Sequence, residues 1–141
     1  EEYNLEGVEV LHHSEYILRL IRQGRLRTGY SAEQRFTYHD PCELGRGSGI
    51  YEEPRAVIEA VGQLLEPDHN RRNAFCCGSS VANTAINDAQ QLTIASKVAE
   101  ELDSTGADIV ITACPQCKKA ITRGSKLRVM DLSEVVAQNL K

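Results

Sequence analysis

The chain has 141 residues, five cysteines, 26% charged residues and a formal net charge of −4. Length and composition fit one globular domain with its own core, so we expect a single domain over residues 1–141. The acidic balance excludes a protein that neutralises runs of phosphate, so no nucleic-acid partner is expected, and no apolar run approaches the roughly 20 residues of a membrane span. An odd number of cysteines, two of them adjacent, indicates reduced thiols in a cytosolic setting rather than a secreted disulfide framework.

The first half of the chain predicts strands that are each followed by a helix. Alternation over residues 8–11 predicts a short strand, and the apolar spacing over 14–24 predicts a helix. A second strand is expected at 36–38. Three glycines lie between residues 44 and 51, and Pro54 then opens a helix whose apolar residues continue to Leu65.

The second half predicts the same alternation. Residues 74–78 read as a short strand that ends in a bend at Gly78, and residues 87–102 read as a helix with Leu92 facing inward. The β-branched run at 108–112 is typical of a buried parallel strand. The last expected elements are a short helix at 118–124, a strand at 128–130 and a terminal helix at 132–140.

Strands that alternate with helices predict the α/β class, with a mainly parallel sheet flanked by helices. In such sheets the loops beyond the carboxyl ends of the strands carry the chemistry. Cys42, the pair Cys76–Cys77 and the unit of Cys114 and Cys117 each follow a predicted strand end. We therefore expect the five cysteines to gather at one edge of the sheet.

The cysteines are spaced as C-x33-C-C-G-x35-C-x2-C. A Cys-x-x-Cys unit lets two thiolates hold one metal centre, whereas a structural zinc ion or a four-iron cubane takes four protein ligands. Five thiols therefore leave one spare, or they indicate a cluster of unusual shape, and the spacing leaves both open. A zinc-binding interaction domain and a metal-free dithiol oxidoreductase that uses Cys114 and Cys117 are the alternatives.

The cysteine spacing occurs together with three further segments, YHDPCELGR at 38–46, GIYEEPR at 49–55 and TACP at 112–115. In this combination the chain resembles the cysteine-rich, or CCG, domain of heterodisulfide reductase and of related iron–sulfur oxidoreductase subunits, including those of glycolate and lactate oxidation. The resemblance covers the chain from about Val8 to its C-terminus. Since Met130 is the only methionine, we expect a piece of a larger protein, and the resemblance implies that this piece is its C-terminal CCG domain.

The resemblance implies a role for each cysteine. It makes Cys42, Cys76, Cys77, Cys114 and Cys117 the ligands of an iron–sulfur cluster of the 4Fe-4S type, non-cubane in heterodisulfide reductase, with zinc as the alternative. It implies electron transfer, together with disulfide reduction at the cluster in some members, and it identifies no catalytic residue. The implied partners are other domains of the same polypeptide and redox partner subunits. The implied location is cytoplasmic, with peripheral membrane association through partners as a variant.

Other polar residues offer weaker candidates. His39 lies three residues before Cys42, where contact with a ligand residue would tune a cluster, although a hydrogen-bonded structural histidine is the more common outcome. A basic stretch follows Cys117 and would attract an anionic partner, although a solvated face is the simpler interpretation. Its members are Lys118, Lys119, Arg123, Lys126 and Arg128.

Overall fold

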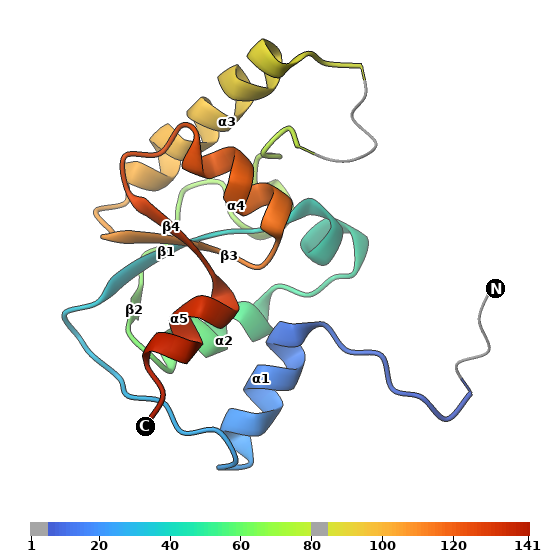
Figure 1. The fold of residues 1–141 in the computed structure, drawn as a ribbon, viewed down its shortest axis with the longest axis vertical. Coiled ribbons are helices and arrows are strands. Elements are labelled where there is room, and N and C mark those ends of the chain that lie inside the picture. The colour runs from blue at the N-terminus through green and yellow to red at the C-terminus, as the bar shows by residue number, and fades with distance from the viewer. Residues whose placement is uncertain (1–5, 80–84) are drawn as a thin grey trace.

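The computed structural model describes residues 6–79 and 85–141 and contains a parallel sheet between two layers of helices (Figure 1). The four strands lie in the order β2-β1-β3-β4 and are all parallel. Their bounds are β1 (Arg35–His39), β2 (Gln63–Leu64), β3 (Ile109–Thr112) and β4 (Arg128–Asp131). The predicted α/β class, with a parallel sheet flanked by helices, is confirmed.

The helices divide between the two faces of the sheet (Figure 1). One face carries α1 (His13–Arg22), α2 (Glu52–Glu59) and α5 (Leu132–Gln138), and the other carries α3 (Asp88–Asp103) and α4 (Pro115–Thr122). Three helices, α1, α3 and α5, begin with a capping box, in which two otherwise unpaired backbone N–H groups are satisfied. These caps explain why the helices begin where they do.

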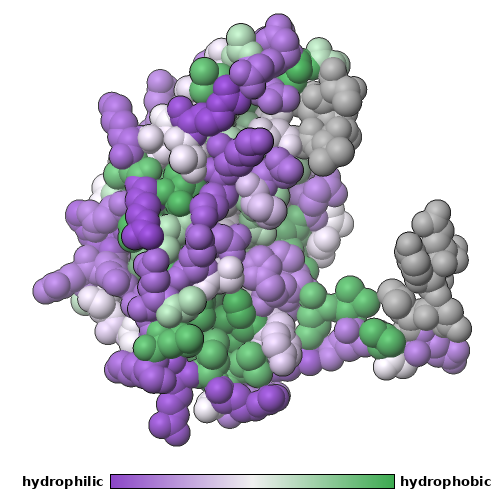
Figure 2. Space-filling view, viewed as in Figure 1, coloured by the Kyte–Doolittle hydropathy of each residue, from purple (hydrophilic) through white to green (hydrophobic). Residues whose placement is uncertain are grey.

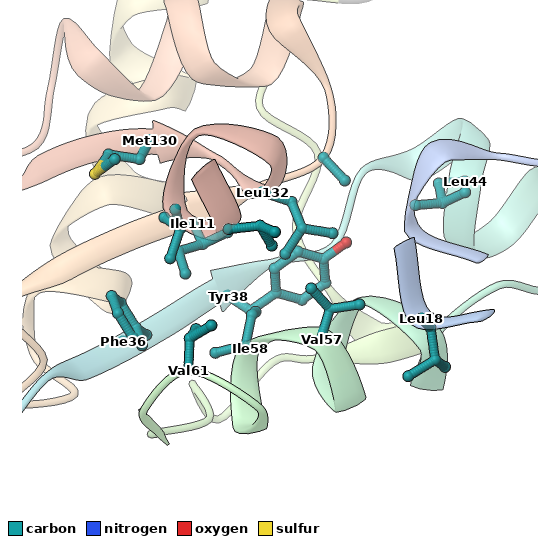
Figure 3. Packing of buried hydrophobic residues seen from close by; sticks show 13 residues of the cluster. Leu18, Phe36, Tyr38, Leu44, Val57, Ile58, Val61, Ile111, Met130 and Leu132 are labelled. Atoms are coloured by element: carbon teal, nitrogen blue, oxygen red, sulfur yellow. The ribbon is translucent and has the colours of Figure 1, made fainter. Parts of the chain in front are cut away.

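Two hydrophobic clusters fill the space between the sheet and its helices. Tyr38 of β1 packs with Ile58 and Leu132 on the α2 and α5 side (Figure 3). On the opposite side Val110 of β3 packs with α3 and α4. Ile111, the next residue along β3, belongs to the first cluster, because successive side chains of a strand point to opposite faces. The sheet is therefore buried on both faces.

The strand order has one point at which the chain reverses its direction of travel across the sheet. From β1 the chain passes through α2 to β2 on one side, and it later returns to form β3 on the other side of β1. The register pairs His39 with Thr112, so these two strands end side by side. In open parallel sheets this switch point is where a crevice forms and ligands bind.

Two strands predicted from the sequence are absent from the described residues. Residues 8–11 form an extended arm, in which Val8 is 60% and Val10 is 71% exposed (Figures 1 and 2). Among the described residues, no strand lies beside this arm to accept its backbone hydrogen bonds. Residues 74–78 follow a 3₁₀ turn at Arg71–Asn73 and are held by side chains instead of by a strand.

Two boundaries and one side-chain orientation also differ from the sequence prediction. The helix after Pro54 ends at Glu59 and the chain then forms β2, because Gly62 lets the backbone approach the oxygen of Gln34, 2.6 Å from where a Cβ would stand. The helix expected at 118–124 begins three residues earlier, with Pro115 in its first turn. Leu92, expected to face inward, is 37% exposed on α3.

His39, the last residue of β1, is buried, and one of its two ring nitrogens lacks a hydrogen-bond partner among the described residues. Its Nε2 lies 3.2 Å from the carbonyl oxygen of Phe75, which can only accept, so this nitrogen carries the proton. The other nitrogen, Nδ1, is buried and has no hydrogen-bond partner among the described residues. Burial lowers the pKa of His39 to about 4, so the ring is neutral near pH 7.

We predict that His39 makes the metal-free chain less stable as the pH falls. Between the usual histidine pKa of about 6.5 and its folded value of about 4, the unfolded chain binds a proton that the folded chain does not. Stability that is present above pH 6.5 is therefore lost progressively below it, by up to about 3 kcal/mol. Urea unfolding at several pH values should show this slope in the parent chain and a flatter slope in His39→Gln. His12→Gln measures the contribution of His12, whose pKa is also lowered by burial.

Replacement of a side chain in the first cluster should destabilise the whole domain. Ile58 is fully buried between α2 and the sheet (Figure 3). Ile58→Ala should lower the free energy of unfolding by about 2–5 kcal/mol, because it removes buried methyl groups and leaves a cavity. Leu92→Ala, at an exposed position of α3, is the matched control and should change it by less than about 0.5 kcal/mol. Equal losses in the two variants would contradict this account of the core.

Candidate metal centre

Cys42 lies in the turn that follows β1. The strand ends at His39, Asp40 and Pro41 follow, and Cys42 then precedes a π-helical turn over Glu43–Gly47. Within this turn Gly45 is covered by the ring of Tyr51, which would lie 2.6 Å from an added Cβ. The turn directs the chain away from the sheet immediately after Cys42, so the thiol stays near the strand end.

Cys114 and Cys117 lie at the start of α4, directly beyond β3. Cys114 is the N-cap residue, Pro115 occupies the first turn and Cys117 is buried in that turn. The N–H groups of a first helical turn have no partners within the helix, and they favour negative charge nearby. Since His39 pairs with Thr112, both strands bring their cysteines to the switch point.

Cys76 and Cys77 reach the same place from a segment without strand structure. Gly78 has a φ of +78°, a backbone conformation that glycine adopts without strain, and it supplies the bend that the sequence predicts after the pair. Cys77 is 3% exposed and belongs to the cluster formed with α3 and α4, whereas Cys76 is half-buried.

The five thiols form a continuous row of neighbours. The Sγ atoms of Cys77 and Cys117 lie 3.3 Å apart. Electrostatic interactions further link Cys42 with Cys76, Cys76 with Cys77, and Cys117 with Cys114. The structure therefore brings together all five cysteines that the sequence predicts as ligands. Their role as ligands stays a prediction.

The two inner thiols of the row influence each other strongly. The hydrogen bond with Cys117, together with the backbone N–H groups of Ser79 and Cys77, lowers the pKa of Cys77 despite its burial. The same hydrogen bond, burial and the charge on Cys77 raise the pKa of Cys117 well above its usual range. Burial and the neighbouring Cys76 likewise raise the pKa of Cys42. Within the inner pair, the hydrogen bond therefore favours the thiolate on Cys77 and the thiol on Cys117.

A cavity of about 900 Å³ lies against this row. Cys42, Cys77, Cys114 and Cys117 line it, whereas Cys76 does not. The remaining walls are largely apolar and include Leu44 from the turn after β1. In the described parts of the chain, no group of three or more His, Cys, Asp or Glu side chains is already arranged around a single metal ion.

Two charged residues near the site have a role that the sequence interpretation missed. Asp40 and Arg55 are each 3% exposed and form a bidentate ion pair, with N–O distances of 2.7 and 2.8 Å. Burial alone would lower the pKa of Arg55, but hydrogen bonds to Asp40 and Glu66 raise it. In the sequence, the sign that these two residues matter was their position inside the segments 38–46 and 49–55, which carry the family resemblance.

The basic stretch after Cys117 is partly neutralised. Lys118 binds Glu134 at 2.6 Å, and Arg123 binds Asp88 at 2.9 Å. These pairs favour the solvated face over an anion-binding surface.

None of the helices in residues 6–79 and 85–141 has both the length and the apolar composition needed to cross a membrane.

The curated proteins that resemble this chain are iron–sulfur proteins and oxidoreductases. The protein named probable membrane-anchored ferredoxin of Chromohalobacter salexigens is 36% identical over 138 residues, which cover 93% of this chain and 21% of the relative. One component of the dihydromethanophenazine:CoB–CoM heterodisulfide reductase of Methanosarcina acetivorans is 34% identical, over 94% of this chain and 34% of the relative. The probable iron-sulfur-binding oxidoreductase FadF of Bacillus subtilis is 27% identical, over 99% of this chain and 21% of the relative.

The chain therefore spans about a fifth to a third of the length of these relatives. A family model described as the CCG cysteine-rich domain matches residues 36–122, a segment that includes all five cysteines, the strand β3 and all of β1 except its first residue. The sequence pattern, the parallel sheet and the family model agree, and the chain belongs to the CCG cysteine-rich domain family.

Proposed function

We propose that this chain is the iron–sulfur cluster-binding module of a larger oxidoreductase. The observation that carries the proposal is the row of five thiols at the switch point of the sheet, beside a cavity large enough for a multi-iron group. The cluster would supply a site that accepts and releases single electrons.

The donor set suits this cofactor. Thiolates are soft ligands that select iron–sulfur clusters, zinc or copper(I), and the row contains five of them. Its members succeed one another along a line, so several iron atoms can each meet a sulfur. The five residues we assign as ligands are Cys42, Cys76, Cys77, Cys114 and Cys117, and a 4Fe-4S cluster of non-cubane form is the type we propose.

The chain's own residues would prepare the site in three ways. The low pKa of Cys77 favours the thiolate that metal binding requires. The start of α4 offers backbone N–H groups to a negatively charged group. The apolar walls, including Leu44, keep water away from it and thereby influence its reduction potential.

A metal-free dithiol oxidoreductase is the alternative that a specific observation favours, since the thiols of Cys77 and Cys117 are close and have strongly split pKa values. Exchange with an external disulfide requires access to the attacking sulfur, however, and both residues are only 3% exposed. Burial therefore disfavours Cys77 and Cys117 as an exchanging dithiol, whereas the unit of Cys114 and Cys117, in which Cys114 is half-buried, stays an alternative. Zinc is the remaining alternative for the same thiols.

The cluster would exchange electrons with other domains of the same polypeptide and with redox partner subunits. The short share of each relative that this chain covers supports a setting as one CCG domain among others. We place the protein in the cytoplasm. The relative named as a membrane-anchored ferredoxin supports a peripheral membrane position reached through partners.

Anaerobic reconstitution tests the proposal directly. The chain incubated with ferrous iron and sulfide should bind about four iron and four sulfide, develop thiolate-to-iron absorption in the visible range, and show a paramagnetic signal in one oxidation state. A parallel sample receives zinc first. Stoichiometric zinc that iron and sulfide cannot displace would contradict an iron–sulfur module.

Substitutions identify the ligands in the same assay. Single Cys→Ser changes at positions 42, 76, 77, 114 and 117 should each lower the iron content or change the spectrum, because a serine oxygen is a harder ligand than a thiolate. His12→Gln alters a residue that lines the same cavity without a sulfur and is the control. A cysteine whose loss changes neither iron content nor spectrum is not a ligand.

A further inference from the structure

The segment that carries Cys76 and Cys77 needs support from outside its own backbone. Residues 74–79 belong to no helix or strand. Cys42 and Cys114 are placed by the ends of β1 and β3, but no equivalent strand in the described ranges places Cys76. Besides the backbone hydrogen bond from Ala74 to the carbonyl oxygen of Arg71, side chains supply contacts that hold this segment.

Three side chains that flank Cys42 supply such contacts. A carboxylate oxygen of Asp40 accepts the backbone N–H of Arg71 at 2.7 Å. The guanidinium group of Arg46 donates to the carbonyl oxygen of Ala74 at 2.6 Å, and His39 donates to that of Phe75 at 3.2 Å. We call His39, Asp40 and Arg46 the clasp. It binds the chain at 71, 74 and 75, immediately before Cys76.

Asp40 is the most firmly held member of the clasp. Arg55 binds both of its carboxylate oxygens, and the same guanidinium group binds Glu66 at 2.6 Å and the carbonyl oxygen of Tyr51 at 2.7 Å. Charge-assisted bidentate pairs of this kind fix geometry as well as energy. The carboxylate therefore has one orientation, which points its second oxygen at Arg71.

The backbone at Arg71 also indicates that this segment is held. Its φ is +54°, the left-handed conformation that residues with a side chain seldom adopt, and no other non-glycine residue in the described ranges has a positive φ. Its side chain binds Glu52 at 2.6 Å, while its N–H binds Asp40. Contacts with α2 and with the end of β1 thus compensate for an unfavourable turn on the way to Cys76.

We propose that the clasp positions Cys76 against Cys42, and that Arg55 acts through Asp40 as a positioning residue. This role goes beyond the binding of a cluster, because it concerns the approach of two thiols in the chain without metal. It holds whether the row receives iron, zinc or no metal, so its test is independent of the proposed cofactor.

The test measures how readily Cys42 and Cys76 form a disulfide. A chain with Cys77→Ser, Cys114→Ser and Cys117→Ser retains only these two thiols. Equilibration with oxidised and reduced glutathione, without metal, converts the two thiols and one oxidised glutathione into a protein disulfide and two reduced glutathiones. The equilibrium gives the effective concentration of one thiol at the other. This value should fall about tenfold in Asp40→Asn, because a charge-assisted hydrogen bond is lost.

Arg46→Met is the second variant, because Arg46 is exposed and its replacement leaves no buried charge unpaired. It should also lower the effective concentration, while circular dichroism verifies that the chain remains folded. The matched controls use Arg35 and Asp108, a bidentate pair at 2.7 and 3.0 Å at the opposite end of β1. Asp108→Asn and Arg35→Met should leave the effective concentration unchanged.

A second starting protein separates an effect on the position of Cys76 from a general loss of stability. It retains only the thiols of Cys114 and Cys117, which α4 places without the clasp. Asp40→Asn should leave the effective concentration of this pair unchanged. Three results would overturn the proposal: no measurable disulfide between Cys42 and Cys76 in the first starting protein, no change of its equilibrium in Asp40→Asn and Arg46→Met, or an equal fall for both pairs.

Discussion

The parallel pairing of β1 with β3 is the interaction on which the cysteine site depends. Its register places His39 beside Thr112, so the two strands end together and their following loops leave the sheet at one point. Both strands are buried between two layers of helices, and the hydrophobic clusters on the two faces resist any slip of the register. A shift by one residue would turn Tyr38 and Val110 toward the wrong layers and separate Cys42 from Cys114.

The site combines two kinds of support. Backbone structure places Cys42 and Cys114, through a π-helical turn and the start of α4. Cys76 and Cys77 arrive through a segment held by side-chain hydrogen bonds to its carbonyl and N–H groups. Buried polar groups normally find partners within regular structure, so such a segment is a costly arrangement unless the partners are fixed in advance. The Asp40–Arg55 pair provides this, since an isolated buried carboxylate would be unstable there.

The sequence predicts the parts of the fold that rest on local pattern. The β-branched run at 108–112 and the helix predicted at 87–102 correspond closely to β3 and α3. The alternation at 8–11 predicts a strand wrongly, because four residues alternate without any neighbour to pair with among the described residues. β2 has only two residues and no periodicity to detect. Arg55 reads as an ordinary surface arginine of a helix, because its burial depends on Asp40, Glu66 and the ring of Tyr38, which lies 5.2 Å away.

The burial of the five thiols varies along the row in a way that bears on how the site is reached. The middle members, Cys77 and Cys117, are 3% exposed within the cluster of α3 and α4, while Cys42, Cys76 and Cys114 are half-buried. A group held by the row would thus rest on rigid inner sulfurs and meet its surroundings at the outer ones. Because electron transfer needs proximity rather than contact with the inner thiols, this burial suits a redox centre. A dithiol formed by the two inner residues, Cys77 and Cys117, would be inaccessible to a substrate disulfide.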